Sequence, residues 1–188
     1  MNNKKAAMFG LDARIALAIF GALSVISGAA LYSAIQKTKT TSAIVTLKEI
    51  EKSIIAYYID TGALLTHEID SSSQVHLSKL ESDSIPGWSG PYFSDKLNGD
   101  VITTQYNNIY ARLGDIISAN SETRVACTIR DIYEKDCTIW LEWYAMPKNI
   151  SEDIDLTIDG SADLTNGSIR YCSVCGGGIG SLFYKVDL

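Results

Sequence analysis

The chain has 188 residues, of which 46% are hydrophobic and 20% are charged, so it can form a packed core and wholesale disorder is excluded. Its net charge is −6, and its Lys and Arg residues are scattered rather than clustered. An acidic chain without a basic patch repels phosphate backbones, which argues against nucleic-acid binding.

A long apolar segment stands near the N-terminus, behind a short basic leader formed by residues 1–10. Residues 15–35 carry no formal charge over 21 positions. As a helix rising about 1.5 Å per residue, they are long enough to cross a bilayer core of roughly 30 Å. A secretory signal has a shorter apolar core of about 7–15 residues. We therefore interpret residues 11–36 as the transmembrane half of a helix that stays with the protein.

Small residues recur along this segment, and such residues let helix backbones approach closely inside a membrane. Any alanine-rich helix shows similar spacings by chance, so the pattern alone leaves both interpretations open. If the segment packs against other helices, the expected contact residues are Ala18, Gly21, Ser24 and Gly28.

The helix is expected to continue beyond the membrane segment, because residues 37–61 contain no proline and no glycine. Gly62 suits the position just past a helix end. Residues 37–62 thus form an amphipathic half, whose single apolar stripe needs a partner surface. The stripe consists of Leu47, Ile50, Ile54 and Tyr57 or Tyr58, and the residues expected to face away are Lys48, Glu49, Glu51 and Lys52.

The remaining residues, 63–188, change to short strand-like segments separated by turn residues. "RVACTI" (124–129) and "CTIWLEWYAM" (137–146) are expected to form a hairpin about "DIYEKD", and "SIRYC" and "SLFYKVDL" a second one. "PKNISEDIDLTIDG" (147–160) predicts one short helix. The predicted fold class is α+β, with the amphipathic half of the long helix packed on an antiparallel sheet of about four or five strands.

Four cysteines occur in two pairs that are close in sequence. Cys127 and Cys137 flank the first predicted turn, and Cys172 and Cys175 bracket a glycine-rich loop. Structural disulfides formed in an oxidising compartment are the favoured interpretation. A four-thiolate zinc site and a redox Cys-x-x-Cys are the alternatives. However, the first pair is spaced widely for zinc, and "GGGIG" is a poor helix start for a redox thiol.

Catalytic chemistry is not visible in the sequence. It contains no G-x-S-x-G, phosphate loop or dinucleotide glycine pattern. Its two histidines, His67 and His76, are expected to be exposed in a polar loop region. Asp155, Asp159 and Asp163 are weak calcium candidates, since the spacing and closing glutamate of an EF-hand are missing. We expect no enzyme activity, no cofactor and no metal.

Taken together, the chain resembles the type IV pilin and type II secretion pseudopilin superfamily, including its minor pilin-like members. The resemblance covers the whole chain in plan, but its specificity lies in a few patches. It departs from the family at Ile15, where an early glutamate is usual. The patches are the leader ending at Gly10, the helix ending "YYIDTG", "GWSGPY" (87–92) and "MPKNISEDIDLTIDGSADLTNGSIRY" (146–171).

The resemblance implies a structural subunit of a type II secretion or type IV pilus-type machine. A prepilin peptidase in the bacterial inner membrane would cut between Gly10 and Leu11 and methylate the new N-terminus. Subunits would then pack their apolar helices together. The N-terminus would lie in the cytoplasm and the globular domain, residues 63–188, in the periplasm, with Trp88 buried inside it. The expected partners are other pilin-like subunits, the peptidase and the inner membrane.

Two other functions remain open at this point. The first is a single-pass, membrane-anchored periplasmic binding or sensor domain that does not polymerise. The second is an anchored periplasmic protein with metal or redox chemistry at its cysteines. Contact between copies of the membrane helix separates the first from a pilin-like subunit, and the oxidation state of the four cysteines tests the second.

Overall fold

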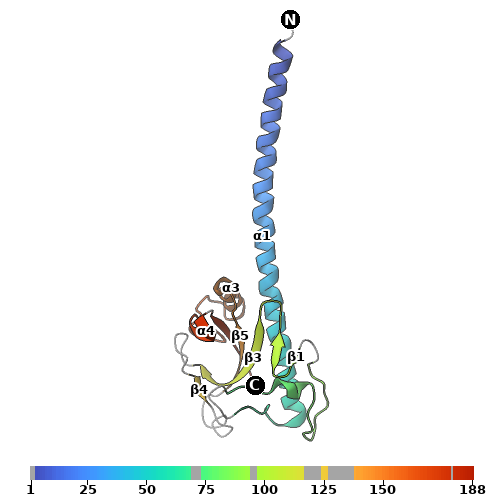
Figure 1. Ribbon diagram of the computed structural model, residues 1–188, viewed down its shortest axis with the longest axis vertical. Helices are drawn as coiled ribbons and strands as arrows, with labels where there is room; N and C mark the ends of the chain where they lie inside the picture. Colours follow the sequence, from blue (N-terminus) through green and yellow to red (C-terminus); the bar gives the residue numbers. More distant parts are fainter. Residues whose placement is uncertain (1–2, 69–72, 94–96, 117–123, 127–137, 179) are drawn as a thin grey trace. The chain divides into compact units, whose positions relative to one another are not determined.

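The structure is a computed structural model that describes residues 3–68, 73–93, 97–116, 124–126, 138–178 and 180–188. The chain divides into two compact units, Met1–Lys39 and Thr40–Leu188. Helix α1 (Asn3–Thr61) contributes to both of them. We call the second unit the head unit, and Figure 1 labels several of its elements.

The head unit combines the outer part of α1 with strands and short helices. Its helical elements after α1 are η1 (Leu77–Leu80), α3 (Lys148–Ile158) and α4 (Cys175–Gly178). Its strands are β1 (Leu97–Asn98), β2 (Val101–Thr103), β3 (Asn108–Ile116), β4 (Arg124–Ala126), β5 (Thr138–Tyr144), β6 (Ile169–Cys172) and β7 (Ser181–Lys185). The structure therefore confirms the predicted α+β class and the predicted short helix.

The strands form one antiparallel sheet. Six of them follow the order β1-β2-β3-β5-β7-β6, and β4 also pairs with β3. The described residues thus contain seven strands, more than the four or five expected, because β1, β2 and β3 were not recognised in the sequence. Strand β3 is central, since it pairs with β5 along one edge and with β2 and β4 along the other.

One predicted hairpin is confirmed and the other is wrong. Strands β6 and β7 pair directly, with Ile169 opposite Tyr184, as expected for the second hairpin. Strands β4 and β5 are not neighbours, because Ala126 and Thr138 pair with Gly114 from opposite edges of β3. Strand β3, which was not predicted from the sequence, therefore lies between the two strands that were expected to pair.

One stripe of α1 is buried against the sheet. The predicted stripe is confirmed, and of the two tyrosine candidates Tyr57 is buried while Tyr58 is exposed. Full burial of a large apolar side chain contributes about 1.5–3 kcal/mol, so this stripe is a major source of stability. The stripe consists of Ala43, Leu47, Ile50, Ile54 and Tyr57, and the same core contains Ile109, Ala111 and Leu113 of β3, Ile139, Leu141 and Trp143 of β5, and Leu182 and Tyr184 of β7.

Glu51 of α1 is buried, contrary to the expectation that it faces away. The hydroxyl of Tyr184 donates to Glu51 Oε2 at 2.8 Å, and Lys48 Nζ donates to the same oxygen at 2.9 Å. Burial raises the pKa of Tyr184 to about 12, so its hydroxyl stays a neutral donor at ordinary pH. A buried carboxylate is tolerated only when it is paired in this way. This polar cluster therefore joins α1 to β7 beside the apolar stripe.

The end of α1 is closed by glycine and by the "GWSGPY" segment. Gly62 has a φ of +64° and its N–H donates to Tyr58 O at 2.8 Å, which is an αL helix end as predicted. Gly87 has a φ of +87°, and a Cβ at this position would collide with the carbonyl oxygen of Asp60. The last turn of α1 and Gly87 thus approach each other so closely that only glycine fits.

Two side chains of "GWSGPY" complete this contact. The hydroxyls of Ser89 and Tyr92 both donate to Asp60 Oδ2, Tyr92 at 2.9 Å. Trp88 is half-buried rather than buried, and its Nε1 donates to Lys79 O at 3.2 Å. The rings of Trp88 and Tyr92 pack edge to face, with their centroids 5.9 Å apart. The segment therefore contributes packing inside the head unit, as the sequence indicated.

Replacing Gly87 by alanine is expected to destabilise the head unit by about 2–4 kcal/mol, because it combines a left-handed backbone with a backbone collision. Gly99→Ala is the matched control, since Gly99 also has a positive φ but an added Cβ meets nothing within 4 Å. The control should cost about 1–2 kcal/mol, for the backbone conformation alone. Thermal or denaturant unfolding measures both variants, and equal losses would contradict the close contact with α1.

Candidate assembly segment

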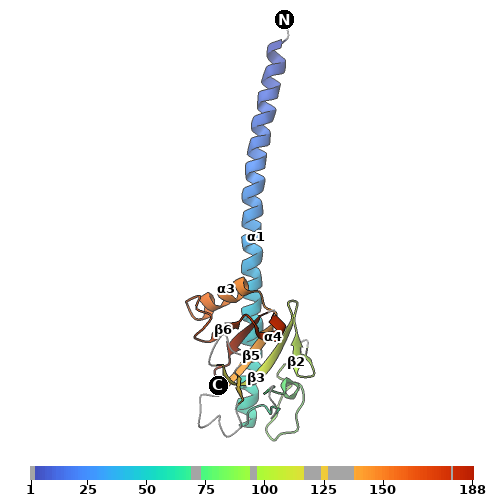
Figure 2. The same cartoon turned by 60° about the vertical axis from the view of Figure 1, so that its left-hand side comes forward.

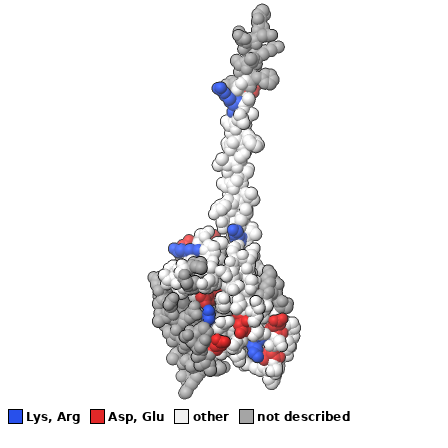
Figure 3. Space-filling model, viewed as in Figure 1, with Lys and Arg blue, Asp and Glu red and all other residues white. Residues whose placement is uncertain are grey.

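The first unit presents an apolar helix surface. Within α1, the span Asp12–Thr61 contains a window that is long and apolar enough to cross a membrane, and none of that window is buried. Figure 3 shows a long part of this helix in white, without red or blue atoms. The exposed large side chains are Ile15, Leu17, Ile19, Phe20, Leu23, Val25, Ile26, Leu31, Tyr32 and Ile35.

The four residues expected to make helix contacts all lie on this exposed surface. Ala18, Gly21, Ser24 and Gly28 are exposed, and a Cβ added at either glycine would meet nothing within 4 Å. Such positions leave room for a second helix to approach the backbone closely. The contact with a second helix stays a prediction.

The predicted processing site lies inside the described helix. α1 begins at Asn3, so Gly10 and Leu11 both belong to it, and Gly10 is exposed. Asp12 and Arg14 follow as exposed charged residues, and Ile15 stands at 51% exposure. Cleavage between Gly10 and Leu11 stays a prediction.

One of the two expected disulfides falls within the described residues. Cys172 and Cys175 are bonded, with their Cα atoms 5.4 Å apart, and both are buried. They pack with Trp140 and Phe183 in a small second core. Trp140 alternates along β5 with the residues that face α1, so this cluster lies on the opposite face of the sheet. Cys127 and Cys137 lie outside the described residues.

The surroundings of the disulfide are those of a structural bond rather than a reactive one. A helical turn, α4, does begin at Cys175, although the glycine-rich sequence made a helix start unexpected. Reactive thiols are partly exposed and lie in electropositive surroundings, whereas Cys172 and Cys175 are covered by aromatic side chains. The bond ties the end of β6 to the turn that leads into β7, which is a structural role.

The three calcium candidates lie on and after α3, the helix that packs near β6 (Figure 2). Asp159 follows the helix and its Oδ2 accepts from the backbone N–H groups of Ser168 and Ile169, at 2.8 and 2.9 Å. Asp163 accepts from Thr165 N and from the Asn166 amide in a tight turn. The described residues include no group of three or more acidic, His or Cys side chains placed to hold a metal ion.

Asp155 is the unusual member of this set. Its side chain is almost fully buried in α3, and neither carboxylate oxygen makes a hydrogen bond of good geometry in the described part of the chain, although the Asp159 carboxyl and the Asp163 N–H lie close to it. Burial, and then the charge of the neighbouring Asp159, raise the pKa of Asp155 to about 6. A carboxyl in such surroundings is stable when protonated and costly when charged.

The histidines differ from the expectation of solvent-exposed loop residues. His76 is half-buried, and its Nδ1 lies 2.9 Å from Asp100 Oδ2, while Asp100 Oδ1 accepts from Ser78 N at 2.9 Å. Burial of Asp100 is outweighed by these hydrogen bonds, so the pKa of its carboxyl is lowered. The interaction fixes η1 to the β1–β2 turn and was not foreseen, because its partners are 24 residues apart.

Comparisons with protein-family models, with curated proteins and with solved structures find no match for this chain. The architecture nevertheless is pilin-like, with a long apolar N-terminal helix packed through its outer part on an antiparallel sheet. The membrane-capable helix and the buried disulfide together indicate a single-pass membrane or secreted protein.

Asp155→Asn is expected to change how stability depends on pH. In wild type the Asp155 carboxyl has a pKa of about 6 in the folded state against an ordinary value of 3.8. The folded state therefore binds this proton more tightly. The contribution of this bound proton to the stability of the folded state is complete below about pH 4 and is lost as the pH rises through about 6.

The neutral amide introduced by Asp155→Asn does not titrate, so the variant should be more stable than wild type at pH 8 by about 1–3 kcal/mol and show no such advantage at pH 4. Asp153→Asn, on the exposed face of the same helix, is the control and should leave the pH profile unchanged. Denaturant unfolding from pH 4 to 8 measures these profiles. Parallel profiles for wild type and Asp155→Asn would contradict a raised pKa for Asp155 in the folded protein.

Proposed function

We propose that this chain is a pilin-like or pseudopilin-like subunit of the type IV pilin and type II secretion superfamily, without enzymatic activity. It would work by assembly in a type II secretion or type IV pilus-type machine. The observation that carries this proposal is the exposed apolar surface of α1 in the first unit. Such a surface needs lipid or other helices around it.

Assembly would proceed through the small residues of this surface. Inside a membrane, lipid and leucine side chains are equally apolar, so helix association depends on close packing rather than on the hydrophobic effect. Gly21 and Gly28 offer a backbone that another helix can approach closely. Neighbouring subunits would therefore align along their N-terminal helices, and the head units would be carried outside the membrane.

The proposed location is the bacterial inner membrane, crossed once, with the N-terminus in the cytoplasm and the head unit in the periplasm. The Cys172–Cys175 disulfide supports this orientation, because disulfides persist in oxidising compartments such as the periplasm. The proposed partners are other pilin-like subunits and a prepilin peptidase that cuts between Gly10 and Leu11.

Cysteines introduced at Gly21 or Gly28 are expected to form intermolecular crosslinks in native membranes when the protein is treated with a mild oxidant. Cysteines at Ile19 or Ile26 are matched controls, because a period of 3.6 residues places them on the opposite side of α1. Non-reducing electrophoresis measures the dimer, with the unaltered protein as the blank. Equal crosslinking on both sides, or none at all, would favour a domain that is only anchored.

Intact-mass measurement of the protein from its native membrane tests the processing step separately. We expect a mature chain that begins at Leu11 and carries one added methyl group at its N-terminus. Gly10→Val, which places a branched side chain before the cut, should leave the leader attached. A mature chain that still begins at Met1 would contradict processing by a prepilin peptidase.

A further inference from the structure

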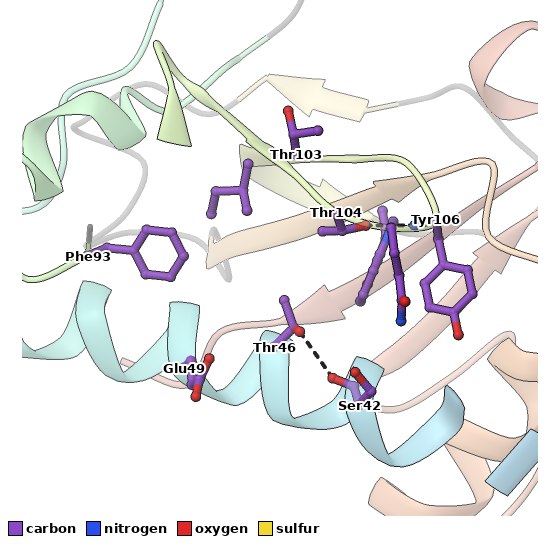
Figure 4. A pocket seen from close by; sticks show the side chains of 10 residues that line it. Ser42, Thr46, Glu49, Phe93, Thr103, Thr104 and Tyr106 are labelled. Atoms are coloured by element: carbon purple, nitrogen blue, oxygen red, sulfur yellow. Dashed lines mark hydrogen bonds between the residues drawn. The ribbon is translucent and has the colours of Figure 1, made fainter. Parts of the chain in front are cut away.

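A half-open cavity of about 220 Å³ lies in the head unit, between α1 and the connection from β2 to β3. Figure 4 shows Ser42, Thr46 and Glu49 along α1 on one side and Thr103 and Thr104 facing them. Phe93 stands at one end of the cavity and Tyr106 at the other. Assembly through the N-terminal part of α1 does not require this cavity, because its lining residues all belong to the head unit.

The charges around the cavity exclude one class of ligand. Glu49 is the one charged residue that lines it, and no Lys or Arg is among the described lining residues. Glu49 is exposed at the rim, and the described residues form no ion pair with its carboxylate. An anion such as phosphate or a carboxylic acid would be repelled here. A ligand that fits this lining would be neutral or positively charged.

The hydrogen-bonding groups of the lining favour a ligand that both donates and accepts. The Thr46 hydroxyl donates to Ser42 O at 3.0 Å, which leaves its oxygen able to accept a hydrogen bond from a ligand in the cavity. Trp143 and Tyr106 also line the cavity, and neither Trp143 Nε1 nor Tyr106 Oη has a hydrogen-bond partner in the described structure. Both of these atoms are shielded from solvent, so the polar groups that a ligand can reach are the hydroxyls of Ser42, Thr46 and Thr103 and the Glu49 carboxylate.

The remaining wall is aromatic. The cavity is lined by Phe93, Tyr106 and Trp143. The ring centroids of Tyr106 and Trp143 are 6.0 Å apart. Drug-sized ligands occupy pockets of roughly 300–1,000 Å³, so this smaller cavity has room for about one ring. Hydroxyl groups on several sides together with flat apolar rings are the surroundings that suit a sugar, whose edges are polar and whose ring faces are apolar.

We propose that this cavity binds one neutral sugar ring, as a monosaccharide or as a unit of a longer glycan. The sugar hydroxyls would bond to the hydroxyls of Ser42, Thr46 and Thr103 and to the Glu49 carboxylate. Its ring would lie against Phe93 and Tyr106. The proposal does not depend on assembly through α1, because every lining residue belongs to the head unit.

The experiment is saturation-transfer NMR on the full chain, solubilised in a detergent without a sugar headgroup. The probes are glucose, galactose, mannose and N-acetylglucosamine, each tested alone, with methylamine and inorganic phosphate as charged comparisons. We expect saturable binding of at least one sugar, with a Kd of about 1 mM or tighter. We expect no signal from phosphate.

Two tryptophan substitutions localise the signal. Ser42→Trp fills the cavity from its exposed rim and should weaken sugar binding at least ~10-fold, a loss of about 1.4 kcal/mol. Ser161→Trp makes the same change at an exposed serine that does not line the cavity, and binding should stay as in wild type. Equal unfolding temperatures for the two variants establish that the head unit is intact in both.

The remaining outcomes overturn the proposal. Absence of binding by all four sugars would mean that the cavity holds only water. Sugar binding that survives in Ser42→Trp would place it elsewhere on the protein. Binding of methylamine that is stronger than that of any sugar, and that is lost in Glu49→Gln, would identify a cation site instead.

Discussion

The burial of one face of α1 against the sheet is the interaction on which the rest of the head unit depends. The stripe of Leu47, Ile50, Ile54 and Tyr57 supplies the side of the core that the sheet cannot provide for itself. A sheet that is apolar on one face needs a second layer to cover it. In this protein the second layer is the outer part of a helix whose first part belongs to another unit.

This arrangement explains why several unrelated contacts converge on α1. Glu51 meets Tyr184 of β7, Tyr57 donates to Asp83, and the last turn is held by Gly87 and its neighbours. Each contact fixes a different part of the Thr40–Thr61 segment. The head unit thus holds one end of α1 firmly, while the apolar residues of the first unit remain exposed on their own helix. A subunit that assembles through its N-terminal helix requires both properties.

Much of the fold was predictable because it follows from local patterns. Apolar spacing placed the long helix and its buried stripe, Gly62 and Gly160 ended helices, and the β6–β7 hairpin followed from two strand-like segments around a glycine-rich loop. Strand β3 could have been found in the same way, since Ile109, Ala111 and Leu113 alternate with polar or half-buried residues. Without it, β4 and β5 were paired with each other because they are adjacent along the chain.

Features that depend on distant partners could not be predicted from local patterns. Glu51 looks like a surface residue in the sequence, and its burial depends on Tyr184, 133 positions later, together with the nearby Lys48. The same holds for the contact of His76 with Asp100. It also holds for Asp155, because the helical pattern of its segment does not indicate whether this aspartate is buried or exposed. The cavity near Glu49 combines residues from α1, from the segment that contains Phe93, from β2 and its connection to β3, and from β5. No spacing along the sequence brings them together.

We propose that the apolar half of α1 is a surface for other helices. The most direct test of this proposal is the distance between spin labels attached at Ser24 in protein reconstituted at low density into lipid bilayers. Packed helices lie about 8–10 Å apart, so labels on neighbouring copies should report a short intermolecular distance of roughly that spacing plus the label lengths. A signal from widely dispersed single molecules, unchanged as the protein density rises, would contradict the account.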